Sequence, residues 1–185
     1  MLWPILRKAG IWEGVFQREK KCMSAKCFVD TNILFYAQDR SAGLKHERAA
    51  KIVSDLWQSA TGVLSTQVLQ EFCVAVRRVD RNRAIEDLRQ WVKRYSDWEI
   101  VVNTSESVLA ALSLESRHQI SSWDALIVHA AQVGRADVLY TEGLNDGQVF
   151  GSVRAVILSS SPDLWAERIN WGTAHLPARC ECDDR

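Results

Sequence analysis

The sequence has no long apolar run and little proline. No run approaches the roughly 18 apolar residues that a membrane-spanning helix needs. The apolar N-terminus is interrupted by Arg7, Lys8 and Glu13, so it makes a poor signal peptide. We therefore expect a cytoplasmic protein without a membrane partner. The 185 residues include only three Pro and nine Gly, which argues against a fold dominated by loops.

Paired cysteines and an excess of one charge are also absent. The five cysteines are odd in number, and none shows the C-x-x-C spacing of a zinc or redox site. Cys180 and Cys182 lack a second ligand pair, so we expect no zinc site and a reducing compartment. The 23 basic side chains equal the 23 acidic ones, which excludes a protein that coats nucleic acid through bulk charge.

Short apolar segments alternate with amphipathic ones along most of the chain. Strands are predicted at 27–30, 62–65, 99–103, 137–141 and 153–158. Helices are predicted at 44–60, from Thr66 to about 76, at 83–95, at 105–117, and from Ser121 or Ser122 to Gly134. The expected N-caps are Thr66, Ser105 and Ser121 or Ser122, and Gly134 is the expected left-handed C′ residue. Strands separated by helices favour parallel pairing, with helices on both faces of the sheet. The length fits one domain.

Four acidic residues stand where such a fold gathers its functional groups. Asp30 closes the first strand, and Asp146 lies in the loop after the fourth. Glu71 and Asp124 lie in early turns of helices. Each has a structural explanation of its own, as a helix cap, a turn residue or a solvated side chain. Ligands in α/β folds, however, bind outside the carboxyl ends of the strands, where these acids can converge.

Converging carboxylates need a cation. Two of them about 5 Å apart repel by roughly 3 kcal/mol at an effective dielectric constant near 20. An oxygen-only cluster suits Mg²⁺ or Mn²⁺. Such an ion keeps water ligands and can activate one of them to attack a phosphodiester.

Four stretches stand out together: Phe28–Tyr36, Ser65–Phe72, Ser122–Ile127, and Val138–Glu142 with Asp146-Gly147. In this order they resemble the PIN-domain proteins, and especially the VapC-type toxins of toxin–antitoxin pairs. The resemblance covers roughly residues 23–156.

The resemblance implies a PIN-like three-layer α/β/α fold with a short central, mostly parallel sheet. It implies a metal-dependent endoribonuclease, with metal-site acids at Asp30, Glu71 and Asp124. It also implies an antitoxin that blocks the site, and a toxin homodimer. The expected polar members of the same pocket are Thr31, Asn32 and Thr141.

The sequence departs from the family pattern in three places. Relatives often have Thr-Glu-Asp after the fourth strand, whereas Gly143 stands at the Asp position here. We therefore take Asp146 as the fourth acid, with Glu142 in reserve. Residues 1–22 form an upstream extension or follow a misplaced start, and we expect poor order there. The PIN-like domain is expected at 23–158, and residues 159–185 form a C-terminal tail.

The sequence-based mechanism is a metal-activated water that cleaves RNA. Asp30 and Asp124 would ligate Mg²⁺, while Glu71 and Asp146 would bind a second ion or orient the attacking water. Residues 77–94 carry seven basic and three acidic side chains. That stretch is either a solvated surface or a binding surface for RNA phosphates. Candidate RNA contacts are Arg77, Arg78 and Arg81.

Other functions are open. A PIN-like module without catalysis, binding RNA or protein, is the main alternative. A phosphatase with an aspartyl nucleophile needs a second Asp two residues after Asp30, where Asn32 stands. A nucleotide-binding protein is disfavoured because no glycine-rich phosphate loop follows a strand.

Overall fold

The computed structural model describes residues 25–158. The expectations for residues 1–22 and for the tail 159–185 lie outside the described residues. Within them, strands and helices alternate along the chain as the sequence predicted. The strands are β1 (Cys27–Val29), β2 (Gly62–Ser65), β3 (Glu99–Val101), β4 (Val138–Thr141), β5 (Val149–Phe150) and β6 (Val153–Ile157). The helices are α1 (Thr31–Gln38), η2 (Arg40–Ala42), α2 (Leu44–Ser59), α3 (Thr66–Val79), α4 (Ile85–Tyr95), α5 (Ser105–His118) and α6 (Ser122–Val133).

The strands form one sheet in the order β3-β2-β1-β4-β6-β5, and all neighbours are parallel except β5 and β6. The chain moves from β1 outward through β2 to β3, and then returns to place β4 on the other side of β1. This reversal is a topological switch point, and a crevice at the carboxyl ends of β1 and β4 is where such folds bind ligands.

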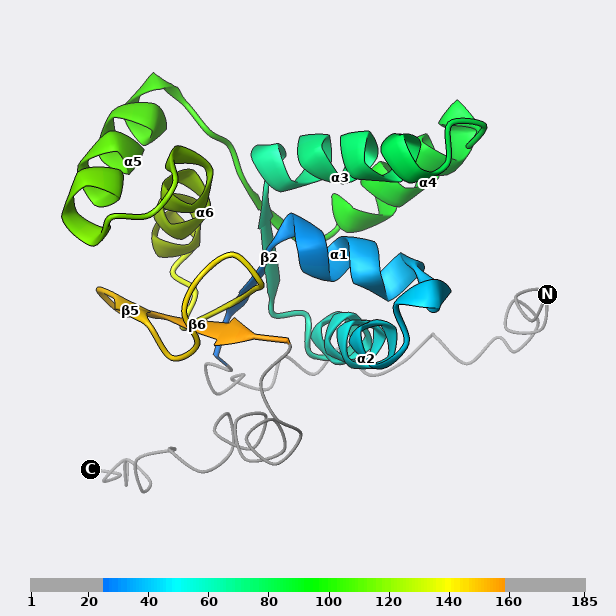
Figure 1. Ribbon diagram of the computed structural model, residues 1–185, viewed down its shortest axis with the longest axis horizontal. Helices are drawn as coiled ribbons and strands as arrows, with labels where there is room; N and C mark the ends of the chain where they lie inside the picture. The colour runs from blue at the N-terminus through cyan, green and yellow to red at the C-terminus, as the bar shows by residue number, and fades with distance from the viewer. Residues whose placement is uncertain (1–24, 159–185) are drawn as a thin grey trace, which may run out of the picture.

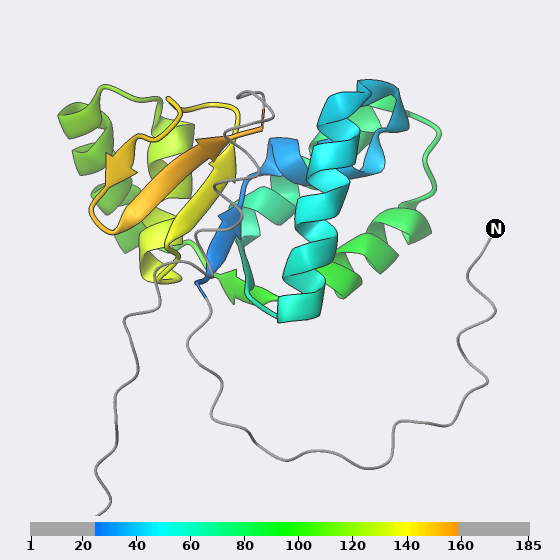
Figure 2. The same ribbon diagram turned by 90° about the horizontal axis from the view of Figure 1, so that it is seen from below.

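Helices cover the sheet on both sides. Helices α5 and α6 lie together on one side, and α1 to α4 lie on the other (Figures 1 and 2). Buried side chains of α2 at Ala49, Ile52, Val53 and Leu56 form the inward stripe that a helical period predicts. The predicted α/β/α fold with a mostly parallel sheet is confirmed.

Three elements were not predicted: α1, the single turn η2 and β5. Helix α1 begins one residue after β1 ends, and its apolar residues 33–37 are consecutive, so they show no helical period in the sequence. Strand β5 has two residues and forms an antiparallel hairpin with β6. No helix in the described part of the chain is long and apolar enough to cross a membrane.

Two helix caps lie one residue earlier than predicted. Ser65, not Thr66, caps α3: its backbone is extended, and its Oγ accepts a hydrogen bond from the Val68 N–H at 3.3 Å. Thr104 caps α5 through a reciprocal pair of hydrogen bonds with Ser107. Ser121, one of the two predicted candidates, caps α6. Short hydroxyl side chains in extended backbone satisfy the free N–H groups of the first turn.

Gly134 ends α6 for a reason other than the predicted left-handed cap. Its φ is −70°, which any residue adopts, whereas the next residue, Arg135, has φ +53°. A Cβ at Gly134 would lie 2.7 Å from Cγ1 of Val63 in β2. The glycine is therefore required by close packing of the helix end against the sheet.

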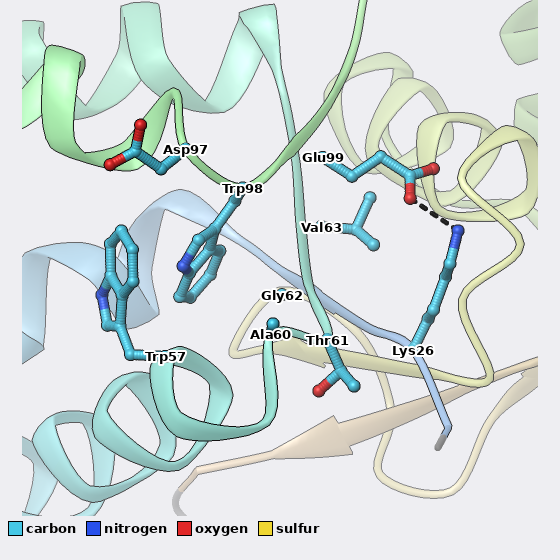
Figure 3. Close-up of a pocket in the computed structure, with 9 residues that line it drawn as sticks. All are labelled: Lys26, Trp57, Ala60, Thr61, Gly62, Val63, Asp97, Trp98 and Glu99. Carbon is cyan, nitrogen blue, oxygen red and sulfur yellow. Dashed lines mark hydrogen bonds and ion pairs between the residues drawn. The ribbon is translucent and has the colours of Figure 1, made fainter. Parts of the chain in front are cut away.

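Aromatic rings pack at the amino-terminal edge of the sheet, opposite the carboxyl edge where the crevice lies. Trp98 lies on Gly62, and its ring centroid is 5.3 Å from that of Trp57. The two indoles and the ion pair of Lys26 and Glu99 line a cavity of about 250 Å³. In Figure 3 the indoles lie on one side of β2 and the ion pair on the other. A Cβ on Gly62 would lie 2.4 Å from atoms of the Trp98 ring.

Gly62→Ala should therefore destabilise the protein, because either the indole or the start of β2 must move. We expect the free energy of unfolding to fall by about 1–3 kcal/mol, the usual effect of overpacking, as measured by urea denaturation. The control is the same substitution in a Trp98→Leu background, where removal of the ring should make it less damaging. Strictly additive losses in the two backgrounds would contradict this explanation.

Candidate active site

Asp30 lies at the end of β1, and its carboxylate is buried. Its Oδ1 accepts a hydrogen bond from the Thr31 N–H at 2.6 Å. Its Oδ2 accepts from Thr141 Oγ1 at 2.6 Å and from Asn32 Nδ2 at 2.8 Å. The Asp30 N–H also donates to the Tyr140 carbonyl at 2.9 Å. The end of β1, the start of α1 and the end of β4 are thus joined at one side chain.

Burial of the Asp30 carboxylate raises its pKa to about 6, because the charged form is poorly solvated there. Hydrogen bonds from Thr141 and Thr31 favour the ionised form and lower the pKa. The charges of Glu71 and Asp124 raise it. These two other acids are therefore near enough to act on Asp30 electrostatically.

Glu71 lies one turn into α3, and both of its carboxylate oxygens are held. Thr31 Oγ1 donates to Glu71 Oε2 at 2.9 Å, and Gln67 Nε2 donates to Glu71 Oε1 at 2.8 Å. Gln67 is 4% exposed, and its Oε1 accepts a hydrogen bond from Asn103 Nδ2 at 3.3 Å. The sequence showed Gln67 and Glu71 to be one turn apart, but it gave no sign that Asn103 supports them.

Asp124 lies in the first turn of α6. Ser121 Oγ accepts from the Asp124 N–H at 3.1 Å and donates to Asp124 Oδ2 at 2.7 Å. A carboxylate in this place is also favoured by the helix dipole. The loop after β4 passes close by, since a Cβ on Gly143 would lie 2.7 Å from Asp124 Oδ1. The position where relatives often carry an acid therefore borders Asp124.

One pocket of about 410 Å³ brings the three acids together at the carboxyl edge of the sheet. Asp30, Glu71 and Asp124 all line it, from β1, α3 and α6. Other lining residues are Thr31, Asn32, Phe35, Tyr36, Gln67, Ala75, Trp123 and Ile127. Three of the four predicted acids therefore share this pocket. Two of the three predicted polar residues, Thr31 and Asn32, line it with them.

The donor atoms fit a hard divalent cation. The pocket offers carboxylate, hydroxyl and amide oxygens, the ligands that Mg²⁺ and Mn²⁺ prefer. Asn32 also lines it, and its Oδ1 is a buried oxygen without a hydrogen-bond partner among the described residues. Within residues 25–158, no three His, Cys, Asp or Glu side chains form a ready-made metal site. Mg²⁺ bound through one or two carboxylates usually keeps several water ligands.

The other predicted residues lie beside the pocket or away from it. Thr141 donates a hydrogen bond to Asp30 but does not line the pocket. Asp146 Oδ1 accepts a hydrogen bond from the Ile157 N–H at 3.2 Å, and Glu142 pairs with Lys45 at 2.7 Å. Neither acid lines the pocket. A role for either as the fourth acid stays a prediction.

The basic residues lie farther along α3 and in the turn that follows. Arg77, Arg78 and Arg81 are exposed, and none of them forms an ion pair with a described residue. At 1.5 Å rise per residue, Arg78 lies about 10 Å along the helix axis from Glu71. Their contact with RNA stays a prediction.

Comparison with known families assigns the chain. The model of the PIN domain matches residues 27–145, and the chain therefore belongs to the PIN-domain family. The match includes Asp30, Glu71 and Asp124.

Two solved structures have a similar fold. A toxin–antitoxin complex from Klebsiella pneumoniae matches at 18% identity and a TM-score of 0.51, over 69% of this chain and 95% of the other. VapC20 of Mycobacterium tuberculosis, a sarcin-ricin loop cleaving toxin, matches at 20% identity and a TM-score of 0.52, over 70% of this chain and 99% of the other. A comparison with curated proteins gave no match.

The raised pKa of Asp30 makes stability depend on pH in a testable way. In metal-free buffer the folded chain binds the Asp30 proton more tightly than the unfolded chain, whose carboxyl has the ordinary pKa of 3.8. The resulting stability is fully present below pH 3.8 and is lost as the pH rises through about 6. We expect wild type to lose about 3 kcal/mol more than Asp30→Asn across this range, by urea unfolding with a chelator. Parallel pH profiles of the two proteins would contradict the burial of an ionisable Asp30, and Asp97→Asn is the exposed control.

Proposed function

We propose that this chain is a divalent-metal-dependent endoribonuclease and the toxin of a toxin–antitoxin pair, acting in the cytoplasm with Mg²⁺, or with Mn²⁺ in its place. The main support is the convergence of Asp30, Glu71 and Asp124 on one pocket at the carboxyl edge of the sheet. Membership of the PIN-domain family supports the same function.

Asp30 and Asp124 would hold the metal, directly or through water. When bound, the ion supplies the positive charge that activates water and stabilises the leaving oxygen of the phosphodiester. Asp30 is positioned for this by its three hydrogen-bond donors. Asp124 is positioned by Ser121, which holds its Oδ2.

Glu71 would orient the attacking water and accept its proton. Its carboxylate is fixed from two sides, by Thr31 of α1 and by Gln67 of its own helix. A base held in this way needs little reorganisation when the reaction begins. Asn32 lines the same pocket and donates a hydrogen bond to Asp30.

The antitoxin is proposed as a partner that closes the acid pocket. Arginine is the side chain best suited to this, because its guanidinium matches carboxylates with two parallel hydrogen bonds. One of the similar structures is itself described as a toxin–antitoxin complex. A homodimer is also proposed, and exposed Val108, Leu109 and Leu112 on α5 offer apolar surface for a protein contact.

Substitution of the acids tests the nuclease proposal. Asp30→Asn, Asp124→Asn and Glu71→Gln keep size and shape but remove the charge, and each should reduce metal-dependent RNA cleavage by about a hundredfold or more. The readout is the initial rate of cleavage of a labelled single-stranded RNA with and without Mg²⁺ or Mn²⁺. Asp146→Asn and Glu142→Gln, measured in parallel, show whether either serves as a fourth acid.

The control variant is Asp97→Asn, an exposed acid at the opposite edge of the sheet, which should cleave at the wild-type rate. Full activity of Asp124→Asn would contradict the proposal. RNA binding by a folded protein that shows no cleavage with either metal would instead support the PIN-like module without catalysis.

A further inference from the structure

Trp123 is exposed in a way that the fold does not require. Its side chain is 66% exposed, while Trp98 in the aromatic cluster is 7% exposed. Trp123 lies in the first turn of α6, directly before Asp124, and it lines the acid pocket. The indole therefore stands in water beside the proposed metal site.

Further aromatic rings line the same pocket from another element. Phe35 and Tyr36 of α1 are half-buried and meet edge to face, with ring centroids 6.2 Å apart. The pocket thus combines three carboxylates with rings from α1 and α6. A nucleotide carries groups that match both features. Its phosphate binds a cation held by the acids, and its base has a flat face that stacks on aromatic rings.

The position of Trp123 is coupled to the acids through the backbone. The buried amide of Gln67 lies 2.8 Å from Glu71 Oε1 and 3.5 Å from the Trp123 carbonyl, to which its Nε2 donates. Asp124 follows in the next position of the same helical turn. The backbone from which the indole projects is therefore positioned relative to both Glu71 and Asp124.

The surroundings of Trp123 favour a nucleotide over a protein partner. Its neighbours in the turn, Ser121 and Ser122, are exposed and polar. The core of a protein–protein interface is a continuous patch of apolar surface, whereas Trp123 lies among hydroxyls and a carboxylate in its own helical turn. A ring in such polar surroundings, beside a pocket that combines carboxylates with other rings, suits the stacking of a base.

We propose that Trp123 stacks on one unpaired base of the RNA, next to the phosphate held at the acids, and thereby sets which phosphodiester bond is cut. This inference rests on the proposed nuclease function. A base in a duplex is stacked on its neighbours and does not offer its face, so single-stranded RNA is the substrate that this site selects.

Binding can be measured without cleavage in a Glu71→Gln background, which retains Asp30, Asp124 and all pocket rings. We would compare Glu71→Gln with Glu71→Gln/Trp123→Ala by fluorescence anisotropy in Mg²⁺. The probes are a labelled 12-nucleotide single-stranded RNA, the same backbone without bases, and the corresponding duplex. The added Trp123→Ala should weaken binding of the single strand by about tenfold or more, and leave the weak binding of the base-free strand unchanged.

Trp123→Phe in the same background keeps a flat ring and should retain most of the affinity. Thermal unfolding of each variant shows that the exposed substitution leaves the fold intact. Equal affinity of the Trp123→Ala protein for single-stranded RNA would overturn the inference. An altered oligomeric state with unchanged RNA affinity would also overturn it, by assigning Trp123 to a protein interface.

The inference and the proposed function can fail separately. If wild type cleaves RNA but Trp123→Ala neither weakens binding nor shifts the cut positions, only the inference fails. If no metal supports cleavage but Trp123→Ala still loses base-dependent binding, the base site stands and the nuclease function fails.

Discussion

The Asp30 carboxylate is buried where β1 ends, at the centre of the sheet, and three hydrogen-bond donors hold it there. A buried charge without partners is strongly unfavourable, so each donor must stay in place. One donor, Thr31, is the first residue of α1, and another, Thr141, is the last residue of β4. These two elements precede and follow the point where the chain returns across β1. The arrangement of the whole carboxyl edge therefore depends on how this one group is satisfied.

The remaining acids reach the same edge from opposite sides of the sheet. Glu71 comes from α3, on the side of α1 to α4, and Asp124 comes from α6, on the other side (Figure 2). Gln67 contacts both regions, because it donates to Glu71 and to the backbone of Trp123 and accepts from Asn103. A connected network of this kind rigidifies a polar site, and it makes the loss of any member costly.

The sequence predicted much of the sheet and three pocket acids, because these depend on local patterns. Short apolar runs marked the strands, and Asp30 could be read as the residue that ends the first of them. Helix α1 was missed because its residues 33–37 are five consecutive apolar residues, so no alternation of polar and apolar positions reveals a helical period. The supporting role of Asn103 could not be predicted, since its contact with Gln67 joins residues 36 apart in the chain. Close approaches, such as that of Gly143 to Asp124, likewise exist only in the folded chain.

The central claim is that side chains far apart in the sequence form a single pocket that holds a divalent cation. A Mn²⁺ titration of isotope-labelled protein, followed by NMR, tests it directly, because the paramagnetic ion broadens signals close to it. We expect early and selective broadening of the amide signals of Thr31, Asn32 and Asp124, and its loss in Asp30→Asn. Broadening centred on another part of the protein, or none at millimolar Mn²⁺, would contradict the account.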